Sequence, residues 1–492
     1  MGIIQKQAIK GTIYSYIGVV IGFFTTAIIF PRVLTTDEIG LLKLLVSFSV
    51  LFAQFGSLGF NSVINRLFPY FRRPGEKHNG FIALATLVTL AGFLLSTLAF
   101  ELYKPILIKN NIENSRLLVQ YIHLILPLIF ATLFFNLYDS YNKVLYDTVL
   151  GTFLKEFFQR ILILISVISY YFDLITVEQF VYAYMISIFI PTLIFIPVLL
   201  ARGEMTFKIN KNAFLKPVLK EMAIISLYGF ISGLGGLAIL HIDSLMVNRY
   251  LGISMTGIYA TTFFFGTLVL IPSRSLIKIS TTILADSWKS GDIKNIELVY
   301  SKSCINQSII GILIFIGLWV NIDNIFEILP KEFEAGKYVI LFTGLANVFE
   351  MASGVSGMVI GTSEHYRIGA VLIIIFLIIL IGLMAIMVPL FGLTGAAIAI
   401  AIAKFIYGFI RYFFLKLKYR MEPFNYSYLL LILISLAAYG AGYILPTLEN
   451  YILDIFIRST IVLVVFSLLI LVFRISEDVN SIYKNLLKTF NI

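Results

Sequence analysis

Charged residues, cysteine and histidine are all scarce in this sequence. Only 13% of the 492 residues are charged, and the chain has one cysteine and four histidines. A soluble domain carries about a quarter charged residues, so this composition excludes a soluble protein. The lone Cys304 excludes an internal disulfide and gives no metal-binding or redox spacing. The phosphate-binding pattern G-x-x-x-x-G-K-[ST] is also missing, so we expect neither direct use of ATP nor a resident cofactor.

Long apolar runs fill most of the sequence instead. Hydrophobic residues make up 59% of the chain, and the mean hydropathy is +0.95. A helix needs ~20 apolar residues to cross the hydrocarbon core, so these continuous runs predict an all-α polytopic membrane protein. Fourteen spans are expected, at 11–31, 40–63, 80–101, 117–138, 150–172, 179–200, 220–247, 256–279, 303–322, 337–360, 367–389, 393–415, 426–446 and 452–473.

The basic residues indicate how the chain is oriented. One set of alternate connections carries about three times as many Lys and Arg residues as the other set. This asymmetry predicts that both termini lie in the cytoplasm, and the first apolar run is long enough to be a permanent helix. The same asymmetry accounts for the net charge of +10, so no nucleic-acid partner is expected. No connection is long enough to fold as a catalytic domain, so we do not expect an enzyme.

One twelve-residue stretch occurs twice. Pro31–Leu42 and Asn248–Tyr259 align at an offset of 217 residues, with Gly40 matching Gly257. Each copy lies between two apolar runs, as the tip of a hairpin of two membrane helices would. Internal repeats of this kind are a common way to build transporters. We expect three parts: an N-terminal lobe of six helices at 1–205, a C-terminal lobe of six helices at 206–420, and two further helices with a tail at 421–492.

Several of these stretches resemble a known family. Pro31–Gly40 reads P-R-V-L-T-T-D-E-I-G, which resembles the P-x-x-L-T-x-x-E-x-G helix tip of polysaccharide-type flippases. Leu58–Pro69, Ile242–Ala260 and Gly392–Ala399 are similar to later parts of the same family. The resemblance is to the polysaccharide transporter branch of the multidrug/oligosaccharidyl-lipid/polysaccharide exporter superfamily.

The resemblance implies a function as well as a fold. It implies two six-helix lobes around a central cavity that is lined by the first, second, seventh and eighth helices. It also implies that the protein flips a polyprenyl-diphosphate-linked oligosaccharide across the bacterial inner membrane by alternating access. The expected partners are the lipid-linked oligosaccharide and membrane lipids, with a glycan polymerase or glycosyltransferases as further partners to test. We expect a monomer that is driven by a gradient of H⁺ or Na⁺.

Polar and basic residues collect near the predicted cytoplasmic face. Asn61, Asn65 and Arg66 end the second helix, while Arg274 and Lys278 lie on the eighth. Arg binds phosphate in a bidentate manner and Lys acts as a point charge, so these five residues are substrate-binding candidates. The structural alternative is snorkelling and positive-inside retention. We favour that alternative for Lys278 and phosphate binding for Arg66 and Arg274.

Ionisable residues also lie deep in predicted spans, where a charge needs a partner or a wet cavity. Lys404 and Glu350 both lie near the midplane of the membrane. They are either a structural ion pair between helices or functional residues, with Lys404 binding substrate and Glu350 coupling an ion. Asp243 is a second ion-coupling candidate, for H⁺ or Na⁺. Its alternative is a pairing with Arg249 or Arg32, which lie at the outer helix tips and are gate candidates.

The fifth predicted helix carries a further polar group. Glu156 and Arg160 have the spacing of an intrahelical ion pair. Lys155 and Gln159 share the adjacent face and could reach the cavity.

Two other functions remain open at this point. The same architecture serves exporters of cationic drugs or of the peptidoglycan precursor, although drug export favours an acidic cavity and this chain has a basic excess. A membrane glycan polymerase or glycosyltransferase belongs to another class and generally carries a large outer loop. The longest outer connections here, near 102–116 and 323–336, are short.

Overall fold

The computed structural model describes residues 3–206 and 208–481, except for the side chains of 3–6, 8, 9, 211, 275 and 278. The described residues form α-helices with short 3₁₀ and π segments, and no strand occurs among them. They fall into two compact units, Met1–Ala260 and Thr261–Ile492. The boundary lies later than the lobe boundary expected from the repeat. The reason is that the seventh predicted span packs against the second within the first unit.

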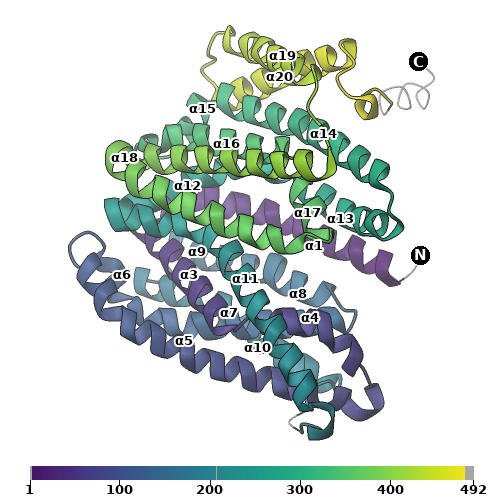
Figure 1. The fold of residues 1–492 in the computed structure, drawn as a ribbon. Helices are drawn as coiled ribbons and strands as arrows, with labels where there is room; N and C mark the ends of the chain where they lie inside the picture. The colour runs from purple at the N-terminus through teal and green to yellow at the C-terminus, as the bar shows by residue number, and fades with distance from the viewer. Residues whose placement is uncertain (1–2, 207, 482–492) are drawn as a thin grey trace. The chain divides into compact units, whose positions relative to one another are not determined.

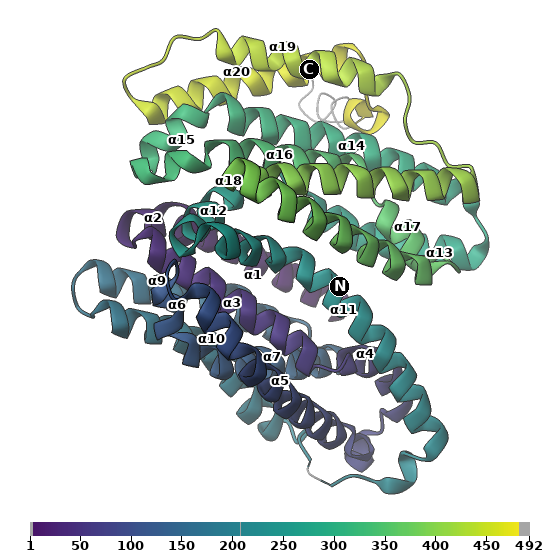
Figure 2. The same cartoon turned by 60° about the vertical axis from the view of Figure 1, so that its left-hand side comes forward.

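The first unit is a bundle built around α3 (Figure 1). In both views α3 lies beside α7 and α11, and α5 and α10 flank α7 (Figure 2). The elements of this unit are α1 (Ile3–Phe23), η1 (Phe24–Ile29), α2 (Phe30–Val33), α3 (Thr36–Gly56), α4 (Phe60–Phe71), η2 (Pro74–Gly80), α5 (Phe81–Asn111), α6 (Arg116–Gln120), η3 (Ile122–Leu124), α7 (Ile125–Val144), α8 (Val149–Thr152), η4 (Phe153–Phe158), α9 (Gln159–Tyr171), α10 (Val177–Ala201), η5 (Lys211–Ala213) and α11 (Lys216–Leu251), followed by the start of α12 (Ile253–Thr267).

The second unit is organised around the contact between α16 and α18, and α19 and α20 pack side by side on α14 (Figure 2). Its elements, after the end of α12, are η6 (Leu268–Leu270), α13 (Ser273–Ser290), α14 (Ile293–Val320), α15 (Ile322–Ile328), η7 (Lys331–Gly336), α16 (Lys337–Ala352), α17 (Ser356–Thr362), α18 (Tyr366–Tyr419), α19 (Ser427–Tyr443) and α20 (Tyr451–Val472).

The helices confirm the predicted fold class, an all-α polytopic membrane protein. Among the described residues, ten helices are long and apolar enough to cross a membrane, and the bent pair of α16 with α17 adds an eleventh span. Helix α18 contains two predicted spans that meet at Gly392, where φ is 58°. Helix α19 is apolar but has only 17 residues. The fifth span is divided into α8, η4 and α9, so every one of the fourteen predicted spans has a helical counterpart.

The L-T-x-x-E part of the first repeat copy is a helix-capping device. The Thr35 hydroxyl accepts a hydrogen bond from the Glu38 amide at 3.3 Å, and the Glu38 carboxylate accepts one from the Thr35 amide at 2.8 Å. This reciprocal arrangement satisfies two amides that a helix start otherwise leaves without partners. The motif therefore fixes the point at which α3 begins.

The two repeat copies touch each other inside the first unit. A Cβ atom on Gly40 would lie 2.1 Å from the Ile253 carbonyl oxygen, and one on Gly257 would lie 1.9 Å from the Thr36 carbonyl oxygen. These residues are themselves related by the 217-residue offset, so the contact is reciprocal. The Thr36 and Ser254 hydroxyls also share a hydrogen bond of 2.7 Å. We call these five residues the tip contact, and its reciprocity is what two copies related by a local two-fold axis would produce.

Candidate functional site

The second predicted span is broken, and the break orients the first group of site candidates. Helix α3 ends at Gly56, and Leu58 and Gly59 both have positive φ, of 48° and 72°. Such backbone geometry is strained for leucine and readily adopted by glycine. Helix α4 then starts at Phe60. The candidates Asn61, Asn65 and Arg66 therefore lie on a separate helix from most of the second predicted span.

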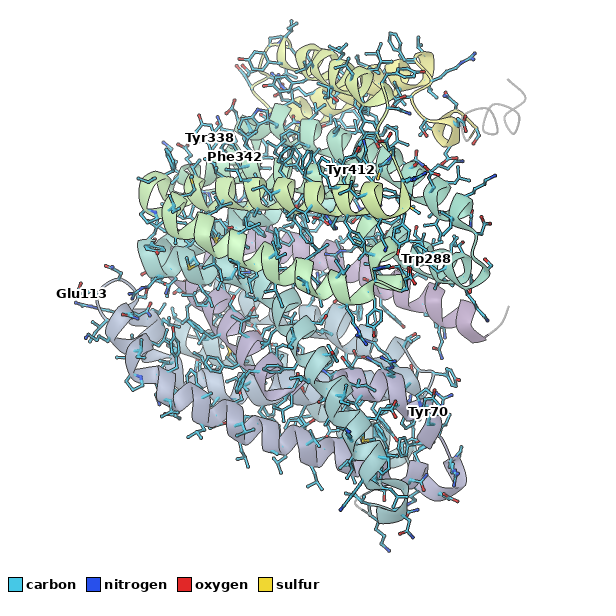
Figure 3. The ribbon with its side chains drawn as sticks, in the orientation of Figure 1. Tyr70, Glu113, Trp288, Tyr338, Phe342 and Tyr412 are labelled. Carbon is cyan, nitrogen blue, oxygen red and sulfur yellow. The ribbon has the colours of Figure 1, made fainter. Side chains whose placement is uncertain are left out.

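Helix α4 is strongly two-sided. Its apolar face is buried, through Phe60, Val63, Ile64, Leu67, Phe68 and Phe71. On the opposite face Asn65 and Arg66 are exposed and Asn61 is half-buried. Tyr70 continues this face, is 81% exposed and marks the far end of the helix in Figure 3. The three predicted residues of this helix thus share one accessible face.

Helix α11 crosses this break at very short range. A Cβ atom on Gly59 would lie 2.1 Å from the Ser226 carbonyl oxygen, and one on Gly229 would lie 2.3 Å from the Ser62 hydroxyl. The Ser226 hydroxyl also donates to the Leu58 carbonyl at 2.6 Å. Small residues at these positions allow the backbones to approach closely. They fix the position of α4 relative to α11.

The remaining substrate-binding candidates near the predicted cytoplasmic face lie in the second unit. Arg274 is exposed in the first turn of α13. Lys278 lies one turn further on, and its side chain is outside the described part of the structure. These two residues and the polar face of α4 therefore belong to different units.

Asp243 is held by hydroxyl and amide groups of the first unit. It lies in α11 and is 1% exposed. Its Oδ1 atom accepts hydrogen bonds from the Ser244 amide at 2.6 Å and the Ser244 hydroxyl at 3.2 Å, and its Oδ2 atom accepts one from the Tyr259 hydroxyl at 3.1 Å. The Lys43 ammonium on α3 attracts this carboxylate electrostatically. A buried carboxylate held mainly by neutral donors has the chemistry to take up a proton or a small cation.

His241 lies two residues before Asp243 in α11 and was missed by the sequence analysis. Its Nδ1 atom forms a hydrogen bond of 3.0 Å with the Ser47 hydroxyl, so it links α11 to α3. The cations of Lys43 and Lys155 both act on it electrostatically. The sequence did carry a signal for this site, because His241 and Asp243 are two ionisable residues close together in an apolar run.

In the second unit a two-step polar ladder joins α16 to α18. Asn347 accepts a hydrogen bond from the Lys404 ammonium at 2.6 Å, and Glu350 accepts one from the Arg411 guanidinium at 3.1 Å. The spacing is one turn on α16 and two turns on α18. Arg411 is 6% exposed and packs its guanidinium 4.3 Å from the centre of the Tyr407 ring. Glu350 is thus in an ion pair, which was one of its two predicted roles, but the cation is Arg411, which the sequence analysis did not single out.

The two gate candidates lie at matching places in the repeat. Arg32 is exposed in the last turn of α2, and Arg249 is exposed in the last turn of α11. Each precedes its own part of the tip contact. Both arginines are therefore accessible beside the point at which the two copies meet.

The connection between α7 and α8 is held by an ion pair outside the spans. The Asp147 carboxylate accepts a hydrogen bond from Arg202 at 2.8 Å and others from the Val149 and Leu150 amides at 3.1 and 3.2 Å. Burial alone would raise the pKa of Asp147, but Arg202 and the two amides outweigh it and hold this pKa below its usual range. This contact ties the end of α10 to the start of α8.

Comparison with known proteins connects this arrangement to a class of transporters. No protein-family model matches the sequence, and no curated protein matches it. The structure of the lipid II flippase MurJ in an inward closed conformation matches with a TM-score of 0.74 and 15% identity, covering 94% of this chain and 98% of that one. An inward-facing multidrug resistance MATE family transporter of the MOP superfamily matches with a TM-score of 0.64 and 15% identity, covering 81% and 94%. The chain shares the fold of these transporters.

A third transporter structure has the same fold. An outward-facing MATE structure also matches, with a TM-score of 0.58, 13% identity and coverage of 85% and 96%. Across residues 3–206 and 208–481, no group of three or more His, Cys, Asp or Glu side chains is placed to hold a metal ion. The polar side chains described above offer ionic and hydrogen-bonding groups within a membrane-spanning helical bundle.

Proposed function

We propose that this protein is a flippase for a polyprenyl-diphosphate-linked oligosaccharide that works by alternating access in the bacterial inner membrane. The observation that carries the proposal is the accessible polar face of α4, with Arg66 and two asparagines, within a fold shared with a lipid flippase. Guanidinium and amide groups bind the phosphate oxygens and sugar hydroxyls of such a head group. Arg274, with Lys278 on the same helix, supplies a second basic contribution under this proposal.

A second substrate has a specific observation in its favour. The match to a lipid II flippase has a higher TM-score, 0.74, than the match to an inward-facing multidrug transporter, 0.64. The peptidoglycan precursor also joins a polyprenyl chain to a sugar through a diphosphate, so the same groups would bind it. Export of a cationic drug is less well supported, because the accessible face of α4 is basic.

The coupling residue in this proposal is Asp243. Uptake and release of H⁺ or Na⁺ by its carboxylate would favour different arrangements of α11 and of Tyr259, which donates to it. Glu350 is the weaker coupling candidate, since it is paired with Arg411. The moving parts would be the lobes 1–205 and 206–420. Movement would then have to change the close contacts of α11 with Gly59 and Ser62.

Reconstituted transport tests the proposal. The purified chain would be placed in liposomes that carry a fluorescent polyprenyl-diphosphate oligosaccharide, the fluorescent peptidoglycan precursor or a cationic dye. Protection from a membrane-impermeant quencher reports flipping of the two lipids, and efflux reports transport of the dye. We expect flipping of an anionic lipid, and dye transport alone would overturn the proposal.

Two variants with matched controls test the residues. Arg66→Ala should slow flipping at low substrate concentration by about ten-fold, because a charge-assisted contact is lost, whereas the exposed Arg73→Ala should have little effect. Asp243→Asn should abolish the dependence of flipping on an imposed ion gradient, whereas the exposed Asp286→Asn should keep it. Unchanged flipping by the Arg66 variant would remove that residue from the site.

A further inference from the structure

A small cavity lies inside the helical bundle of the first unit, apart from the polar face of α4. Its volume is about 140 Å³, and residues of α3, α7, η4, α9 and α10 line it. One water molecule needs roughly 10–15 Å³ of such space, so the cavity has room for several waters or for a small ion with its hydration. Five of its lining side chains carry a hydrogen-bonding group. The Ser49 hydroxyl already donates to the Leu45 carbonyl, and the other four are Thr132, Lys155, Gln159 and Tyr184.

These four groups have hydrogen-bonding capacity that the protein leaves unused. Within the described part of the chain, none of the four side chains forms a hydrogen bond to another residue. A polar group at membrane depth normally has a partner, because leaving it unpaired in hydrocarbon is costly. The groups come from four elements, η4, α9, α7 and α10, which meet at one cavity. Lys155 is exposed and the other three are partly buried, so a ligand or water in the cavity can satisfy them.

The charge at this cavity is positive. The neighbouring acids already have cations of their own, since Glu156 pairs with Arg160 at 2.7 Å and Asp139 pairs with Lys143 at 2.5 Å. Lys155 makes a cation–π contact, 5.3 Å from the centre of the Phe135 ring, and no ion pair with any described residue. Among the described residues that line the cavity, none has a carboxylate. The ammonium therefore has no counter-charge at the cavity.

We propose that this cavity binds a small inorganic anion, with the Lys155 ammonium as its counter-charge. All four polar side chains can donate a hydrogen bond: an ammonium, an amide and two hydroxyls. Hydrogen-bond donors with no carboxylate among them favour an anion such as chloride or phosphate. They disfavour a metal cation, because metal cations such as Ca²⁺ and Mg²⁺ bind mainly to carboxylate and carbonyl oxygens. The Lys155 side chain is also exposed, which gives an ion a route to the cavity. The bound anion would hold η4, α7 and α10 together inside the first unit.

Direct binding of radioactive chloride and of radioactive phosphate to the purified full-length protein tests the inference. One saturable site per chain is expected, and the two ions tested separately show which of them the cavity prefers. Lys155→Met should weaken binding at least about ten-fold, because it removes the counter-charge and a charge-assisted hydrogen bond. Lys155→Arg should retain much of the binding. Tyr184→Phe and Thr132→Val should each weaken it by a smaller factor.

The matched control is Lys109→Met, which removes one charge from the exposed last turn of α5. It should bind the anion as the parent does. Thermal stability in chloride or phosphate against gluconate, at constant ionic strength, gives a second readout that needs no transport activity. Equal anion binding by Lys155→Met and the parent would overturn the proposal and leave Lys155 as a snorkelling side chain. Failure of the flippase assay would not affect either result.

Discussion

Adding one methyl group at Gly257 should push the two repeat copies apart. The new Cβ atom would lie 1.9 Å from the Thr36 carbonyl oxygen, and real Cβ atoms essentially never approach closer than 3.0 Å. The backbones of α3 and α12 would therefore have to separate locally by about 1.1 Å. Overpacking of this kind costs roughly 1–3 kcal/mol. If the tips separate during transport, that cost shifts the equilibrium toward the separated state by a factor of about 5 to 150.

Disulfide cross-linking can measure this shift directly. The hydroxyl oxygens of Thr36 and Ser254 are 2.7 Å apart, so Thr36→Cys with Ser254→Cys should cross-link rapidly under mild oxidation. The native Cys304 is buried and should not interfere. We expect Gly257→Ala to slow cross-linking by at least five-fold, and Gly40→Ala to do the same from the other side of the contact. The cross-linked protein should not flip lipid, and reduction should restore flipping.

The control is Gly236→Ala in α11, where a Cβ atom would meet nothing within 4 Å. This variant should cross-link at the parent rate, and size-exclusion chromatography should show that all variants are folded. Equal cross-linking rates for the parent, Gly40→Ala and Gly257→Ala would refute the reasoning, because the contact would then tolerate the methyl group without moving. Full transport by the cross-linked protein would show that the tip contact does not open.

Three further predictions concern ion pairs and can be followed by thermal denaturation in detergent. Arg411→Ala should destabilise the second unit by about 1–3 kcal/mol, because it leaves the half-buried Glu350 carboxylate without this cation, and adding Glu350→Gln should restore much of the loss. Folding lowers the pKa of Asp147 from its value in the unfolded chain, near 3.8. The contribution of Asp147 to the stability is therefore fully present above that pH and is lost as the pH falls through the lower pKa of the folded state. Arg202→Ala should lower the stability near neutral pH and reduce this acid-dependent loss, so the stabilities of variant and parent should converge as the pH falls below about 3.8; a stability difference that does not change with pH would contradict this. The Arg458 guanidinium donates to the Asp454 carboxylate and to the carbonyls of Gly442 and Leu445, and a Lys side chain cannot keep all of these hydrogen bonds. Arg458→Lys should therefore lower the free energy of unfolding by about 1–3 kcal/mol. A smaller loss than for the exposed Lys109→Ala would contradict this.

The sequence predicted the helices and the repeat well because both depend on patterns that are local or strictly spaced. Apolar run length is enough to place a membrane helix. The glycine match at offset 217 had a physical cause, since Gly40 and Gly257 each face a carbonyl group of the other copy. The capping pair of Thr35 and Glu38 is likewise a three-residue pattern that can be read directly.

Pairing between distant side chains was much less predictable. Glu350 and Lys404 were both recognised as deep charges, but depth alone does not determine which residues face each other. Arg411 lies two turns beyond Lys404, and the helical period would have placed both on one face of α18. Because it lies near the end of the predicted span 393–415, depth in the membrane did not single it out. The break at Leu58 and Gly59 was similarly hidden, because it is stabilised by the Ser226 hydroxyl from α11.

The described contacts differ in how costly they are to break, and this difference bears on the proposed mechanism. The tip contact is made of glycine backbones and one hydrogen bond between hydroxyls, so water or lipid-facing polar groups can replace what is lost when it opens. The Glu350–Arg411 pair is different, since separating it would leave two charges unpaired at membrane depth. A transporter that changes shape should keep such a pair closed throughout its cycle. It should move at contacts that cost little free energy to break. We therefore expect the Thr36–Ser254 pair to separate during flipping, while α16 and α18 remain joined. A cross-link between α16 and α18 beside Glu350 and Arg411 should leave flipping intact, and loss of flipping there would show that the ladder itself moves.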